Sequence, residues 1–212
     1  MNKSDKVKSN ILEAAGETFV ERGFKGTTVR EICKRAGVNF AAVHYHFQSK
    51  EQLYLAVLKH YQTIVYQNYP PDTGIDKDCS AETRLSAFVE RFMFRILGEG
   101  QPSWFGKLVA REYADPTQAL DDLLSEFFQP SFNILTSIVR ELLGNRASEQ
   151  TVRLCATSIV GQCLHFRHSK AVLSRLFQIE NFCKEEVEEI AQHITRFSVK
   201  ALASYMDGKD AV

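Results

Sequence analysis

The stretch that decides the fold reads TTVREICKRAGVNFAAVHYHF and spans residues 27–47. Thr28 and Glu31 have the spacing of a capping box, in which two side chains satisfy free backbone N–H groups at a helix start. Gly37 tolerates the left-handed backbone of a tight turn, and Asn39 can cap the helix that follows. We therefore expect two short helices around this turn. The apolar residues spaced to pack together are Ile32, Ala36, Val38, Val43 and Phe47.

The flanking sequence predicts one helix on each side of this pair. Upstream, apolar residues recur at the spacing of an amphipathic helix, which Gly23 is expected to end. Downstream, Ser49 and Gln52 form a second capping-box pattern, at the start of a helix from about Lys50 towards Tyr69. The upstream apolar residues are Val7, Ile11, Ala14, Ala15 and Phe19.

This helix-turn-helix pattern is typical of proteins that read DNA. The second helix must fit the major groove, about 12 Å wide, while the first helix braces it against the phosphate backbone. The run T-T-V-R-E-I-x-x-x-A-G-V-x-x-x-x-V-x-Y-H-F-x-S-K-E-x-L, which ends at Leu53, resembles the DNA-binding signature of the TetR family of regulators. The resemblance implies phosphate contacts from Thr27, Thr28, Tyr45, His46 and Lys50. It implies base or sugar contacts from Asn39, Phe40, Ala41, Ala42 and His44, and a base or phosphate contact from Arg30.

Two positions depart from the family pattern. Many members have a polar or basic residue where Phe40 stands and a tyrosine where His44 stands, so the preferred bases stay open. Phe40 either touches a thymine methyl group or packs under the turn. His44 and His46 face differently on a helix, which favours DNA contacts over a metal site.

The rest of the sequence predicts an all-α protein. No run of alternating apolar and polar residues is flanked by hairpin turns, and helical periodicity dominates. A polar stretch at residues 70–80 is expected to be a surface loop, Pro130 to kink its helix and Gly144 to end it. Helices are expected near residues 81–98, 103–113, 116–144, 148–170 and 184–206.

A second, more diffuse resemblance covers the C-terminal part. KLVAREYADPTQA at residues 107–119 and Phe128-Gln129-Pro130 resemble CecR-type regulators. Together the two resemblances imply a helix-turn-helix DNA-binding domain at residues 1–50 and a larger helical ligand-binding and dimerisation domain at residues 51–212. Pocket candidates are Phe88, Phe92, Trp104, Phe105, Arg111, Phe127, Phe128, Gln162, His165 and Phe166.

Each of these candidates has a simpler interpretation. Aromatic residues at helical spacing are usually packing residues. Arg111 and its neighbour Glu112, a further polar candidate, could form structural ion pairs. His165 and His168 share a helix face near Cys163, but without a carboxylate pair they fall short of a metal site. We expect no metal and no cofactor.

Dimerisation is expected through the last two long helices, as the family resemblance implies. Two reading helices related by a two-fold axis can contact half-sites about one helical turn of DNA apart. Ser158 and Gly161 are small enough for close helix approach. The alternative is that the same apolar stripes form only the protomer's own core. The interface candidates are Ile159, Val187, Ile190, Ile194, Phe197 and Ala201.

Composition agrees with this interpretation and excludes others. Residues 1–60 carry ten Lys and Arg against six Asp and Glu, and the remaining residues carry sixteen against twenty. A basic N-terminal part suits a polyanion, and random surface charge accounts for an excess of four charges equally well. Five scattered cysteines without a C-x-x-C pair favour a reducing cytoplasm. Neither a signal peptide nor a membrane span is expected, and the chain lacks the common catalytic motifs.

The function expected from the resemblance is a ligand-responsive transcriptional regulator. It would act as a repressor that binds a pseudo-palindromic operator as a homodimer and is released by a small-molecule effector. The alternative is a helical adaptor that contacts proteins and does not bind specific DNA sequences. Salt-dependent binding to DNA separates the two functions.

Overall fold

The computed structural model describes residues 3–70, 78–97, 102–144, 147–178 and 182–206, and every regular element in that part of the chain is helical. The all-α prediction is confirmed. Contacts between helices divide the chain into two compact units, residues 1–68 with 99–124 and residues 69–98 with 125–212. None of the described helices is long and apolar enough to cross a membrane.

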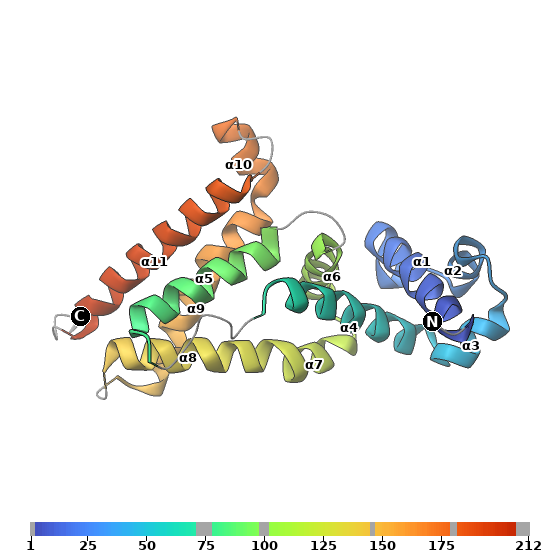
Figure 1. Cartoon of the computed structure of the whole chain (residues 1–212), viewed down its shortest axis with the longest axis horizontal. Helices are drawn as coiled ribbons and strands as arrows, with labels where there is room; N and C mark the ends of the chain where they lie inside the picture. Colours follow the sequence, from blue (N-terminus) through green and yellow to red (C-terminus); the bar gives the residue numbers. More distant parts are fainter. Residues whose placement is uncertain (1–2, 71–77, 98–101, 145–146, 179–181, 207–212) are drawn as a thin grey trace. The chain divides into compact units, whose positions relative to one another are not determined.

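The first unit begins with the predicted helix-turn-helix (Figure 1). Helix α1 packs on α2 and α4, while α6 packs on both α1 and α4. The elements are α1 (Lys3–Gly26), α2 (Val29–Ala36), α3 (Phe40–Phe47), α4 (Lys50–Asn68), α6 (Pro102–Ala114) and α7 (Ala119–Leu123). The core of this unit includes Ile11, Phe19, Ile32, Leu53 and Tyr54, each at most 1% exposed.

Local chemistry explains where these helices begin and end. Thr28 and Glu31 form both hydrogen bonds of the capping box at the start of α2, and Gly37 ends that helix with a left-handed φ of 66°. The Asn39 side chain accepts from the backbone N–H of Ala42 and so caps α3. Gly23, with a φ of 73°, interrupts α1 where the sequence predicts an end.

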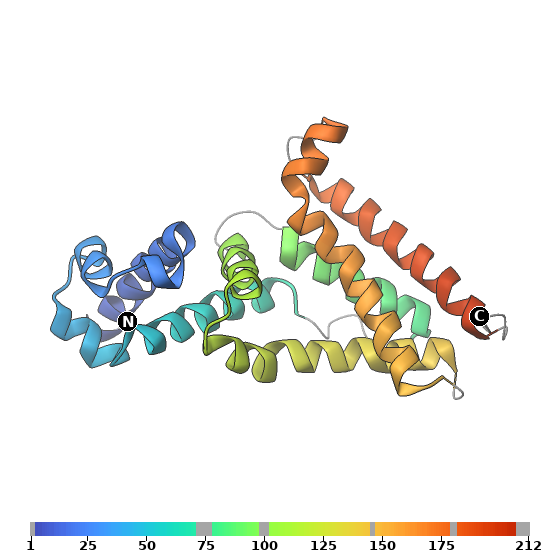
Figure 2. The ribbon, with the colours of Figure 1, turned by 180° about the vertical axis from the view of Figure 1, so that it is seen from behind.

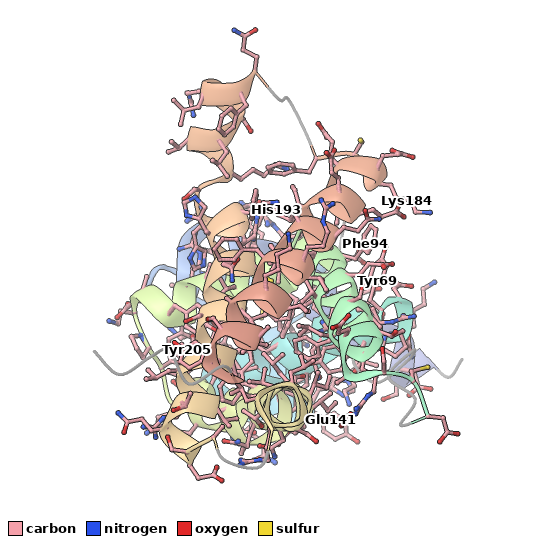
Figure 3. The ribbon with its side chains drawn as sticks, turned by 90° about the vertical axis from the view of Figure 1, so that its left-hand side faces the viewer. Tyr69, Phe94, Glu141, Lys184, His193 and Tyr205 are labelled. Carbon is pink, nitrogen blue, oxygen red and sulfur yellow. The ribbon has the colours of Figure 1, made fainter. Side chains whose placement is uncertain are left out.

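The second unit is a bundle around α5, against which α8, α9 and α11 pack (Figures 1 and 2). Arg84 of α5 pairs with Glu141 of α8, and Tyr69 stacks on Phe94 with ring centroids 5.3 Å apart (Figure 3). Its elements are α5 (Ala81–Leu97), α8 (Gln129–Leu143), α9 (Glu149–His168), α10 (Lys170–Phe177) and α11 (Lys184–Met206).

The described helices differ from the prediction in two places. The single kinked helix expected at residues 116–144 is α7, a π-helical turn at Leu124–Phe128 and α8, with Pro130 in the first turn of α8. The structure also has α10, which was not predicted as a separate helix. Residues 71–77 of the expected surface loop lie outside the described residues.

Candidate nucleic-acid interface

Helix α3 presents a mostly polar and aromatic face to solvent. Its cap Asn39 and the residues Phe40, Ala41, His44 and Tyr45 are exposed, while Val43 and Phe47 are buried on the opposite side. Because side chains three and four residues apart share one face of a helix, Ala41, His44 and Tyr45 lie together. The structure thus brings most of the predicted base-reading residues onto one surface.

The two large aromatic residues on this face are only partly covered by the protein. Phe40 is 61% exposed and Tyr45 is 80% exposed. Exposed apolar residues that stand singly are common on protein surfaces, whereas a contiguous exposed patch often marks an interaction site. Phe40 approaches His44 with ring centroids 6.4 Å apart, and together with Tyr45 these two rings form one exposed aromatic strip. Packing of Phe40 under the turn, the alternative interpretation, does not occur.

The remaining predicted contact residues frame this strip. Ala42 and His46 are half-buried, and the His46 ring meets Tyr45 edge-on with centroids 5.1 Å apart. Arg30 is exposed on α2. Thr28 is exposed as well, although its hydroxyl takes part in the capping box with Glu31.

Thr27 differs from the expectation. Its side chain is 1% exposed, and its hydroxyl donates to the carbonyl of Gly23 at 2.7 Å. The hydroxyl therefore ties the turn before α2 to the end of α1 instead of facing outward. Thr27 and Thr28 are adjacent in the sequence, and the sequence pattern does not reveal which of the two is buried.

Lys50 has a structural role that the sequence pattern does not reveal. Its ammonium group donates to the carbonyls of Phe24 and Thr27 at 3.1 and 3.2 Å and lies 4.2 Å from the centre of the Phe24 ring. An ammonium has three N–H donors, so two of them are used within the protein. Lys50 therefore joins the start of α4 to the segment between α1 and α2.

Ion pairs on the protein surface connect α1 to α2. Arg35 donates to both carboxylate oxygens of Glu21, and Arg22 pairs with Glu31 at 2.5 Å. The hydrogen bonds from Arg35 lower the pKa of Glu21. A groove of about 410 Å³ lies among these residues, lined by Thr18, Arg22, Glu31, Lys34 and Arg35.

The predicted ligand-pocket residues fall into both units. Trp104, Phe105 and Arg111 belong to the first unit, and the other seven belong to the second. Phe88 and Phe127 are buried in the core, and His165 is exposed on α9. The half-buried members of the second unit are Phe92, Phe128, Gln162 and Phe166.

Arg111 and Glu112 are not an ion pair with each other. The Arg111 guanidinium donates to the carbonyls of Val20 and Glu21. Glu112 is 1% exposed and accepts from the Tyr54 hydroxyl at 2.8 Å. Both side chains therefore serve contacts within the first unit.

The predicted dimer residues divide between the core and the surface. Ile159, Val187 and Ile194 are at most 4% exposed and belong to the protomer's own core, against which Ile190 also packs. Their side chains have no surface left for a partner, which corrects their assignment to the interface. Phe197, 59% exposed, and Ala201 do face outward on α11.

An outer face shared by α9 and α11 contains apolar residues that were not predicted at an interface. Leu154 of α9 is 57% exposed and Tyr205 of α11 is 48% exposed. Figure 3 looks onto α11, on which His193 and Tyr205 are labelled. The signal available in the sequence was a second stripe beside the buried one, at Leu154, Ser158, Gly161 and His165.

Comparison with known proteins identifies both parts of the chain. The family described as "HTH-type transcriptional dual regulator CecR, C-terminal domain" matches residues 81–202. The family described as "Bacterial regulatory proteins, tetR family" matches residues 11–57. The chain is 28% identical over 201 residues to the HTH-type transcriptional dual regulator CecR of Shigella flexneri, over 91% of this chain and 90% of that protein.

Solved structures share the fold. FadR from Bacillus subtilis in complex with stearoyl-CoA has a TM-score of 0.65 at 17% identity, over 91% of this chain and 97% of that chain. AibR in complex with isovaleryl coenzyme A and operator DNA has a TM-score of 0.65 at 18% identity, with the same coverage of 91% and 97%.

These family models describe transcriptional regulators and not enzymes, in agreement with the prediction from the sequence. Their matches cover the helix-turn-helix and most of the second unit. The CecR-type model alone extends over more than half of the residues. The chain therefore belongs to the TetR family of bacterial transcriptional regulators, with a C-terminal domain of the CecR type.

Proposed function

We propose that this regulator reads DNA with α3, inserted into the major groove. The observation that carries the proposal is the exposed strip of α3, in which Phe40 and Tyr45 are 61% and 80% exposed. This eight-residue helix can enter the major groove only if no other element of the protein covers its outer face. Asn39, Ala41 and His44 are available at base edges, and Phe40 suits a thymine methyl group.

Phosphate contacts flank this strip in our proposal. Thr28, Arg30, Tyr45 and His46 present groups around α3, and Lys50 has one ammonium donor beyond the two that it uses internally. Such contacts fix the register of a protein on the duplex, while base contacts specify the sequence. Thr27 is left out because its side chain is buried.

We further propose that the functional division follows the predicted boundary, with DNA recognition at residues 1–50 and dimerisation and ligand binding at residues 51–212. The dimer would form through the outer faces of α9 and α11, where Leu154, Phe197 and Tyr205 are exposed. A two-fold dimer suits a pseudo-palindromic operator because each protomer reads one half-site.

The proposed regulation is repression that a small-molecule effector relieves. The structural relatives support a ligand-responsive DNA-binding regulator, since AibR was solved with both isovaleryl coenzyme A and operator DNA. FadR was solved with stearoyl-CoA. For an effector to act, it must bind the DNA-competent and released states with different affinities.

The test is binding of the purified protein to the DNA that flanks its own gene, measured by fluorescence anisotropy at two salt concentrations with excess competitor DNA. We expect binding that weakens steeply with salt, because released counterions drive association with phosphates. Tyr45→Ala should weaken this binding by tenfold or more, because a hydrogen bond to a charged phosphate contributes about 1.5–3 kcal/mol. Tyr45 is so exposed that the fold should not change.

Phe177→Ala is the matched control, because Phe177 is a 66% exposed aromatic residue on α10 in the second unit. It should leave DNA binding unchanged. Equal binding by wild-type protein and Tyr45→Ala would contradict the α3 assignment. Protein that binds no DNA more tightly than the competitor would favour the adaptor function.

A further inference from the structure

The resemblance to CecR-type regulators rests on KLVAREYADPTQA, and neither DNA contact nor dimerisation explains this motif. Two adjacent residues within it, Arg111 and Glu112, lie near the C-terminal end of α6. Both are charged, yet Arg111 donates to backbone carbonyls and Glu112 is 1% exposed. A carboxylate is buried at this level only where several donors satisfy it.

The buried carboxylate of Glu112 accepts hydrogen bonds from two segments of the chain. The Tyr54 hydroxyl of α4 donates to Oε1 at 2.8 Å. The backbone N–H of Thr117 donates to Oε2 at 2.9 Å, and the Thr117 hydroxyl lies 3.1 Å from both oxygens. Burial and the hydrogen bond to Glu112 raise the pKa of Tyr54, so the phenol stays protonated and keeps donating.

Tyr54 carries this connection into the centre of the helix-turn-helix. Its ring meets Phe19 of α1 edge-on at 4.8 Å and Phe24 at 5.1 Å between centroids. Phe24 in turn lies under the ammonium of Lys50. A continuous set of contacts therefore runs from Glu112 to the segment that joins α1 and α2.

Arg111 connects α6 to the other helix of this contact, α1. Its Nη2 lies 3.0 Å from the carbonyl of Val20 and 3.1 Å from that of Glu21. These carbonyls belong to the last turn of α1 before Gly23, where the kink removes intrahelical donors. A guanidinium also complements the negative end of the helix dipole. A Cβ at Gly23 would come within 2.9 Å of Arg111 Nη1.

We propose that Arg111 and Glu112 are positioning residues for DNA binding, through which α6 fixes the orientation of α1 and α4 and thereby of the reading helix α3. Arg111 holds the end of α1, and Glu112 holds Tyr54 of α4. Lys25 of α1 pairs at 2.6 Å with Asp115, the residue directly after α6, and adds an exposed contact. This inference rests on the proposed function for its effect on DNA, but its structural part is testable without DNA.

The structural test is hydrogen–deuterium exchange on full-length Arg111→Met, Tyr54→Phe and wild-type protein. Arg111→Met should speed exchange of the amides at residues 20–27, and Tyr54→Phe should speed exchange in the first turns of α4. Lys107→Met is the matched control, because Lys107 is an exposed cation on α6 one turn earlier. Exchange in both variants identical to wild type would overturn the proposal.

The functional test uses the DNA flanking the gene as the probe. Arg111→Met and Tyr54→Phe should bind it about tenfold more weakly, within the 5–150-fold range typical of coupled sites. Arg111→Lys, which keeps a donor, should recover part of this affinity, whereas a role in stability alone would leave affinity unchanged once folding is complete. If wild-type protein binds no DNA while exchange responds as expected, the positioning contacts stand and the proposed function fails.

Discussion

At the scale of single residues, Arg30 and Lys50 show how two cations expected at DNA differ. Arg30 is exposed on α2, whereas the ammonium of Lys50 donates to two backbone carbonyls and covers the Phe24 ring. Removing an exposed cation leaves the contacts within the protein unchanged. Removing Lys50 also leaves the carbonyls of Phe24 and Thr27 without their donor.

We therefore expect Arg30→Ala and Lys50→Ala to behave differently. Both should weaken DNA binding and lower the salt slope by about 0.9 for each phosphate group that the protein no longer neutralises. Only Lys50→Ala should also lower the free energy of unfolding, by about 1–3 kcal/mol. Urea unfolding and salt titrations measure the two effects separately. Unchanged stability of Lys50→Ala would show that the internal hydrogen bonds are not important for folding.

The cysteines give a second prediction for single residues. Cys79 and Cys183 are exposed, while Cys33, Cys155 and Cys163 are buried. Burial raises the pKa of the Cys163 thiol to about 12, which leaves almost no reactive thiolate at pH 8. Iodoacetamide should therefore add to two cysteines of the native protein and to five after denaturation, as counted by intact mass. Native modification of Cys163 would contradict its burial.

Single residues could be predicted from the sequence where their role is local. The capping box of Thr28 and Glu31, the left-handed Gly37 and the cap Asn39 involve neighbours within three or four positions. Lys50 could not be predicted because its partners, the carbonyls of Phe24 and Thr27, become its neighbours only after α4 packs on α1. Thr27 donates to a local carbonyl, that of Gly23, but the sequence pattern does not show that its side chain is buried.

At the scale of helices, α1 and α4 approach each other closely at Gly16. A Cβ there would lie 2.4 Å from the Tyr61 ring of α4, which also meets Trp104 of α6 edge-on at 5.2 Å. Tyr61 is 1% exposed and cannot swing into solvent. Glycine is therefore required at this contact between helices by space and not by backbone conformation.

Gly16→Ala should destabilise the protein by about 1–3 kcal/mol, the usual cost of overpacking. Gly26→Ala is the matched control in the same helix, since a Cβ there would lie 3.5 Å from Arg22 Cβ, an ordinary contact. The control should be neutral or slightly stabilising because alanine favours helix. Thermal unfolding followed by circular dichroism measures both variants. Equal melting temperatures would show that α1 and α4 can separate at little cost.

Helix α4 could be predicted almost to the residue, since a capping pattern and an apolar stripe mark it. Helix α10 could not, because no residue in it is buried and a single residue, Ser169, separates it from α9. The π-helical turn at Leu124–Phe128 also escaped prediction. Pro130 indicates an interruption of the helix, but the sequence does not specify the form that the backbone takes there.

At the scale of the whole molecule, the sequence identifies helices with apolar residues on two faces. It does not indicate which face contacts a partner. On α11, Val187 and Ile194 point into the protomer's core, whereas Phe197 and Ala201 lie on the outside. Apolar stripes on both sides look equivalent in a sequence, which explains why three interface candidates proved to be core residues. A partner that covers the outer stripe would bury Leu154, Phe197 and Tyr205 together.

Phe197→Glu should convert the proposed dimer into a folded monomer. In the protomer Phe197 is 59% exposed, so glutamate there is compatible with the fold, but a dimer through this face would bury an unpaired charge. Gln192→Glu is the control, since it adds the same charge at an exposed polar position of α11.

Sedimentation velocity at several concentrations measures the assembly, and circular dichroism confirms folding. A dimeric Phe197→Glu protein would place the interface elsewhere, whereas monomeric Phe197→Glu with dimeric Gln192→Glu protein would locate it at this face. The monomer should then bind operator DNA far more weakly, because each copy reads only one half-site.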